Sequence, residues 1–164
     1  MLKPISRESL PRALEKAERY RLLNEPFLAE SICLDVLLVE PTNSRALIVF
    51  VLALTDQFSS AEGAVQRAQA TVAQMSSEYD RLYYSGIIAE RRAITTLAKR
   101  GFQAATVAWN SIKQAMAFYE KAMAVQQDDA NDDAVLRWNT CVRLLEAHKL
   151  TQPVPELRSL VLDD

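Results

Sequence analysis

The clearest structural signal in this chain is the stretch 11–44, PRALEKAERYRLLNEPFLAESICLDVLLVEPTNS. Apolar residues recur at helical spacing on both sides of a turn at 24–26, whose proline suits the first turn of a helix. The segment 40–44 ends the second helix, because the residue before a proline is pushed out of helical geometry, and Asn43 or Ser44 suits the cap of a third. The stretch therefore predicts two antiparallel helices, 11–23 and 27–39.

The same pattern returns further along the chain. Ala17, Val51 and Gly86 occupy the same phase of the apolar pattern, about 34 residues apart, which is a period typical of stacked helical hairpins. The helices that this periodicity predicts beyond the first two are 45–57, 59–75, 79–100, 102–127 and 135–148, followed by a short last helix at 156–162.

Local start and stop signals accompany these helices. Ser59 with Glu62, and Ser77 with Asp80, match the capping box that opens a helix. Gly101 follows a basic last turn and suits the left-handed residue that ends one. We therefore expect an all-α fold with one helical domain at 10–150, between an N-terminal arm at 1–9 and a tail at 151–164.

Composition and charge exclude several classes of protein. The chain has 164 residues, three glycines and a net charge of −2, which indicates a helix-rich globular protein and argues against nucleic-acid binding. The longest apolar run, 46–54, is about half the length of a membrane span. The start, 1–7, is charged and lacks the apolar core of a secretory signal, so we expect a cytoplasmic protein without membrane contact. Cys33 and Cys141 are expected to be buried, reduced thiols.

No residue cluster in the sequence has a catalytic or cofactor-binding signature. His148 is the single histidine, which excludes histidine-based triads and multi-histidine metal sites. The acidic run 128–133 alternates like a calcium loop, but Ala134 stands in place of the turn glycine and Thr140 in place of the bidentate glutamate. The sequence also lacks a glycine-rich phosphate loop. We therefore expect no enzyme activity, no cofactor and no metal site.

The repeated pattern resembles the tetratricopeptide repeat family. The first hairpin carries the family's small, aromatic and closing residues at Ala17, Tyr20, Ala29 and Pro41. The segment 115–123 is similar to the family's second helix, and Gly86 supplies the small residue that allows close helix approach. The resemblance implies a right-handed superhelix whose first helices line a concave groove for a peptide or protein segment. A helical bundle without such a groove is the alternative.

The resemblance also assigns groove-facing residues by their phase relative to the small positions. These are Leu14, Glu18, Arg21, Leu22, Arg45, Ile48, Leu52, Thr55, Tyr83, Ile87, Glu90 and Arg91. Leu14 and Glu18 stand where a carboxylate clamp needs Lys and Asn, so a chaperone-tail ligand is not expected. The predicted function is a non-catalytic adaptor that binds a protein or peptide. A secretion-type chaperone of the same family and a helical sensor of a small ligand are the alternatives.

The third predicted helix is apolar around its whole circumference at 46–54, which is typical of a helix buried on all sides. If Ile48 and Leu52 face the groove, something must cover them, because large exposed apolar patches are uncommon on soluble monomers. Three covers fit the sequence: the chain's own C-terminal tail or lengthened third hairpin, a second copy in a homodimer, or a partner segment. A compact bundle with this helix at its centre also fits.

Overall fold

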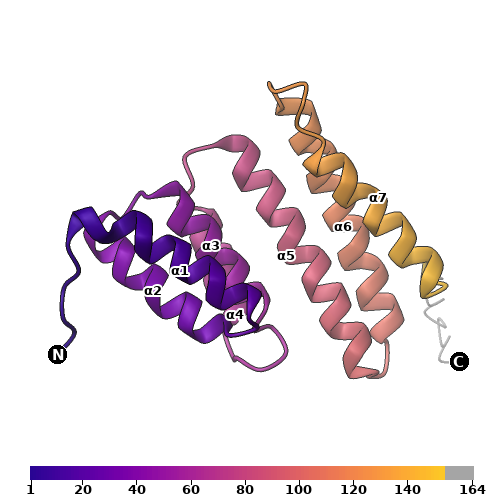
Figure 1. Ribbon diagram of the computed structural model, residues 1–164. Coiled ribbons are helices and arrows are strands. Elements are labelled where there is room, and N and C mark those ends of the chain that lie inside the picture. Colours follow the sequence, from indigo (N-terminus) through magenta and orange to yellow (C-terminus); the bar gives the residue numbers. More distant parts are fainter. Residues whose placement is uncertain (154–164) are drawn as a thin grey trace, which may run out of the picture.

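The computed structural model of the chain describes residues 1–153, and these residues are all-α, as predicted. Figure 1 shows the α-helices in chain order, and a short 3-10 helix, η1, precedes α1. The elements are η1 (Arg7–Ser9), α1 (Leu10–Leu22), α2 (Pro26–Val39), α3 (Ser44–Thr55), α4 (Ala64–Val72), α5 (Glu78–Lys99), α6 (Ala104–Val125) and α7 (Asp133–Ala147). The last predicted helix, 156–162, lies outside the described residues.

Successive helices pack as hairpins, and the first helix of each hairpin also contacts the first helix of the next. The pairs α1 with α2, α3 with α4, and α5 with α6 form the hairpins, while α7 packs on α6 (Figure 1). Contacts of α1 with α3 and of α3 with α5 align the first helices side by side. This order of packing is compatible with a superhelical stack, because every element rests on its chain neighbours.

Helix α3 is the central helix of the N-terminal half. It contacts α1, α2, α4 and α5, and eight of its twelve residues are buried. Val51 and Leu54 have no exposed surface, whereas Ile48 and Leu52 are half-buried. The apolar circumference of this helix is therefore covered mainly by the chain's own hairpins, and nothing further is needed to cover most of it.

Gly86 allows the closest approach between two helices. A Cβ atom at this position would lie 2.7 Å from Cδ1 and 2.8 Å from Cζ of Tyr119, which are separations that real Cβ atoms do not adopt. The Tyr119 ring is fully buried against α5 and belongs to the apolar core of the last three helices. The expected close packing at Gly86 is confirmed, because a hydrogen atom is the largest side chain that fits there.

Two of the predicted helix starts are confirmed in detail. The Asn43 side chain accepts a hydrogen bond from the backbone N–H of Ala46 at 2.9 Å, and the Ser77 hydroxyl accepts one from Asp80 at 3.1 Å. Each bond satisfies a backbone donor that the first helical turn leaves without a partner.

The start predicted at Ser59 is wrong. Helix α4 begins five residues later, at Ala64, after Gly63 in the left-handed conformation at φ 74°. Residues 56–63 form turns instead, and Phe58 within them is buried in the core. That tertiary contact holds the segment out of the helix, although the local capping pattern is present.

The residue that ends α5 also differs from the prediction. Arg100, and not Gly101, takes the left-handed conformation, at φ 48°. The helix therefore ends at Lys99, two residues before the glycine. Both cysteines are free and buried, as expected. Within the described part of the chain, no helix is both long enough and apolar enough to cross a membrane.

Candidate functional site

The first helices of the three hairpins enclose an open cavity of about 460 Å³. This volume lies within the range of ligand-binding pockets. The end of α1, the end of α3 with the turn after it, and the C-terminal half of α5 supply the walls. The lining residues are Arg21, Leu22, Asn24, Thr55, Asp56, Ser59, Arg91, Ile94 and Thr95.

Four of the residues predicted to face a groove meet in this cavity. Arg21 and Leu22 come from α1, Thr55 from α3 and Arg91 from α5. They are separated by up to 70 positions in the sequence and are brought together because the three helices stack in the same phase. The repeat phase therefore placed four of the twelve predicted residues around one cavity.

Three other predicted groove residues are buried and do not lie on a free surface. Leu14 is 3% exposed and packs in the core between α1 and α2, and Ile87 is 4% exposed. Glu90 is 1% exposed, accepts a hydrogen bond from the Tyr119 hydroxyl at 2.8 Å and pairs with Arg137 of α7 at 3.1 Å. Their assignment to an open groove is corrected, because packing within the chain buries Leu14 and Ile87, and Tyr119 of α6 and Arg137 of α7 cover Glu90.

Tyr83 lies half-buried beside Glu90. Its ring stacks on Tyr79 at a centroid distance of 5.7 Å and meets Tyr84 edge-on at 5.1 Å. Burial raises the pKa of Tyr83 to about 12, so its hydroxyl stays protonated at physiological pH. Tyr83 thus belongs to an aromatic cluster and does not line the cavity.

Glu18 and Arg45 form an ion pair between α1 and α3. Arg45 donates from Nε and Nη2 to the two carboxylate oxygens of Glu18 at 2.8 and 2.7 Å. The hydrogen bond from Arg45 holds the pKa of Glu18 below its ordinary value. Because the pair is largely exposed, it contributes little stability. Glu18 and Arg45 bind each other and lie outside the cavity, as do the half-buried Ile48 and Leu52.

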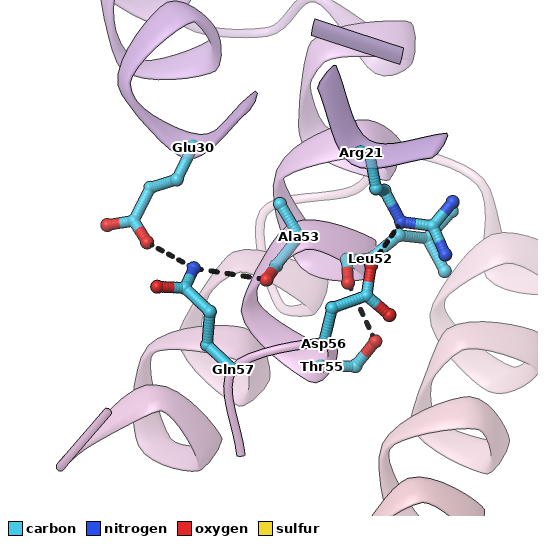
Figure 2. A network of polar contacts seen from close by, with 7 residues as sticks. All are labelled: Arg21, Glu30, Leu52, Ala53, Thr55, Asp56 and Gln57. Carbon is cyan, nitrogen blue, oxygen red and sulfur yellow. Dashed lines mark hydrogen bonds and ion pairs between the residues drawn. The ribbon is translucent and has the colours of Figure 1, made fainter. Parts of the chain in front are cut away.

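Arg21 is held at the edge of the cavity by Asp56. Its Nε donates to Oδ2 of Asp56 at 2.7 Å, and its two terminal nitrogens point away from that carboxylate (Figure 2). A guanidinium carries five N–H donors, and this contact uses one of them. Both side chains are only about a fifth to a quarter exposed. Arg21 therefore remains able to bind a further anion.

Arg91 approaches the cavity from α5. Its Nε atom is buried without a hydrogen-bond partner, and no ion pair joins Arg91 to a carboxylate within residues 1–153. A buried donor without a partner costs free energy, so the Nε of Arg91 contributes no stabilising hydrogen bond within the chain. The cavity therefore combines two guanidinium groups with one carboxylate, and it has an excess of positive charge.

A second polar network fixes the end of α3 that carries Asp56. The Gln57 amide donates to Glu30 of α2 at 2.7 Å and to the carbonyl oxygen of Ala53 at 3.1 Å (Figure 2). Arg67 of α4 also pairs with Glu30. These bonds join three helices, and buried networks of satisfied polar groups make a structure rigid. The position of Asp56, and with it that of Arg21, is thus set by contacts outside the cavity.

The sequence reasoning missed the other lining residues. Ile94 and Thr95 follow Arg91 at spacings of three and four, so they lie on the same face of α5 and the helical phase contains that signal. Asn24, Asp56 and Ser59 lie in or next to turns, where periodicity carries no information.

The lining of the cavity is rich in hydrogen-bond donors and has one more positive than negative side chain. Its lining has guanidinium, hydroxyl and amide donors and includes neither a histidine nor a cysteine that would serve as a base or nucleophile. Among the described residues, no group of three or more His, Cys, Asp or Glu side chains is placed to hold a metal ion. Comparison of the chain with protein-family models, with curated proteins and with solved structures gives no match.

Proposed function

We propose that this chain is a non-catalytic, cytoplasmic interaction module built from tetratricopeptide-like hairpins, and that it binds a protein or peptide segment in the cavity between α1, α3 and α5. The observation that carries the proposal is the convergence of side chains from the first helices of three successive hairpins on one open cavity. Stacked helical hairpins create extended concave binding surfaces of this kind.

The rim of the cavity suits a peptide chain. Leu22 is 83% exposed and Ile94 is 38% exposed, and both flank the two arginines. Apolar side chains beside charged and hydroxyl donors are able to contact a segment through its side chains and its backbone carbonyls together. The hydroxyl groups of Ser59 and Thr95 supply further hydrogen-bonding positions along the wall.

Site-specific photo-crosslinking tests the proposal. A benzoylphenylalanine residue in place of Leu22 projects from the rim of the cavity, and its exposure means that the substitution should preserve the fold. The matched control places the same residue at Lys113, which is exposed on α6. We expect one protein to crosslink in cells through position 22 and not through position 113.

The Arg91→Glu substitution completes this experiment. Combined with the crosslinker at position 22, it should abolish the adduct while the helical circular dichroism is unchanged. Equal adducts at positions 22 and 113, or an adduct at 22 that survives Arg91→Glu, would count against the cavity as the binding site.

A further inference from the structure

Resting on the proposed function, we infer that the bound segment is acidic and that one of its carboxylates binds between Arg21 of α1 and Arg91 of α5. The inference concerns the chemistry of the ligand, which the proposed function leaves open. It is carried by the charge of the cavity and by the hydrogen-bond donors that its two arginines leave unused.

The charge of the cavity is opposite in sign to that of the whole chain. Its lining holds Arg21, Arg91 and Asp56, whereas the whole chain has a net charge of −2. Two guanidinium groups and one carboxylate therefore belong to the lining of the same open cavity. A positive site on a negative molecule attracts anionic segments locally and gives specificity through charge complementarity.

The two arginines offer hydrogen-bond donors of the kind that a carboxylate accepts. Arg21 is oriented by its single bond to Asp56, so its terminal nitrogens are presented to the ligand at little further entropic cost (Figure 2). Arg91 lines the same cavity and forms no ion pair with a carboxylate within residues 1–153. A carboxylate that accepts from both guanidinium groups would form charge-assisted hydrogen bonds, which are the stronger class.

An acidic peptide fits this surface better than a nucleic acid does. Single-stranded nucleic acids bind by stacking bases on aromatic side chains, and the cavity lining contains no aromatic ring. Leu22 and Ile94 at the rim instead provide apolar contacts that side chains next to an Asp or Glu would use. The lining thus combines the contacts that a mixed acidic and apolar sequence requires.

Peptide display on the full chain tests the inference separately from the proposed function. A random phage-displayed peptide library is selected on the immobilised wild-type protein, and the best peptide is synthesised with its Asp and Glu residues either kept or changed to Asn and Gln. Binding of both peptides is then measured by fluorescence anisotropy at two salt concentrations. We expect the selected peptides to be rich in Asp and Glu, and the amide version to bind at least about 10-fold more weakly, because it loses charge-assisted hydrogen bonds.

Variants with one charge removed locate the binding site. Arg91→Gln should weaken binding of the acidic peptide by about 10-fold to 100-fold, as expected for lost charge-assisted hydrogen bonds, and Arg91→Lys should restore part of it. Arg92→Gln is the matched control, because it removes the same charge at the next residue of α5, whose side chain lines other cavities. It reports the effect of net charge alone and should change the affinity less than about 2-fold. Thermal melts of all three variants check the fold.

Each other outcome has a distinct meaning. If the selected peptides are neutral or basic and their binding still depends on Arg91, the inference of an acidic ligand is refuted and the proposed function stands. If no peptide is selected at all, both are refuted. Equal losses in Arg91→Gln and Arg92→Gln would reduce the effect to net charge and refute the site. Binding of free glutamate, inorganic phosphate or a single-stranded RNA as tightly as the peptide would replace the inference with a small-anion or nucleic-acid site.

Discussion

Gly86→Ala is the substitution for which the structure makes the sharpest prediction. The new methyl group would lie 2.7 Å from Cδ1 of Tyr119 and closer still to Cε1, so the ring must move by more than about 0.7 Å to reach the ordinary contact distance of 3.4 Å. The ring is fully buried, and its hydroxyl donates to the buried Glu90 at 2.8 Å, so that hydrogen bond is strained or lost. The change therefore acts on the junction of α5, α6 and α7.

Three contributions decide the magnitude. Overpacking a core costs about 1–3 kcal/mol, and a lost hydrogen bond to a charged group costs about 1.5–3 kcal/mol. The helix propensity of Ala exceeds that of Gly by about 1 kcal/mol, which opposes both costs. We expect Gly86→Ala to lower the free energy of unfolding by about 2–4 kcal/mol, measured by urea denaturation followed by circular dichroism.

Two controls make this reasoning refutable. Gly101→Ala should change the free energy of unfolding by less than about 0.5 kcal/mol, because no atom lies within 4 Å of its new Cβ. In a Tyr119→Leu background the clashing ring is absent, so Gly86→Ala should become neutral or stabilising. A Gly86→Ala protein as stable as the wild type, or a destabilisation that persists without the ring, would show that α5 and α6 are not in this contact.

Three further predictions concern a cap, the cysteines and the core. Asn43→Ala should lower the free energy of unfolding by about 1 kcal/mol because it removes a helix cap, while Ser59→Ala should change it by less than about 0.5 kcal/mol; equal effects would contradict the observed start of α4. Burial raises the pKa of Cys33 and of Cys141 from 9.0 to about 12, so both thiols should resist Ellman's reagent at neutral pH and react on unfolding. Because the pKa of each thiol is higher in the folded than in the unfolded protein, the protonated thiols contribute fully to stability below pH 9, and this contribution is lost as the pH rises toward 12. Urea titrations between these pH values should show a falling free energy of unfolding. Leu54→Ala should cost about 2–5 kcal/mol in the same urea assay because the side chain is fully buried, and a cost below 1 kcal/mol would place α3 at the surface.

Most of the helices were predictable because their signals are local. The hairpin of α1 and α2 follows from apolar spacing and from the prolines, and the Asn43 and Ser77 caps are visible in the sequence. The error at Ser59 arose where the local capping pattern was present but burial of Phe58 held the segment in turns. A local rule fails at such a point because one tertiary contact outweighs a weak propensity.

The candidate site was predictable only in part. Arg21 and Arg91 were placed on one side by the repeat phase, and both line the cavity. Glu90 has the same phase and yet is buried. Tyr119 of α6 donates a hydrogen bond to its carboxylate, and Arg137 of α7 forms an ion pair with it. Periodicity states which way a side chain points along its own helix, but it does not state which later helix will cover it.

The amino-acid sequence by itself determined most of the helical segments, with the start of α4 as an exception, and which small residue, Gly86, allows two helices to approach, since these depend mainly on the order of residues within a few turns. The tertiary structure alone decided that Asp56 orients Arg21, that the Arg91 Nε lacks an acceptor, and that Arg137 of α7 pairs with the buried Glu90. These features depend on the distances between segments far apart in the chain, which packing sets and sequence spacing does not record.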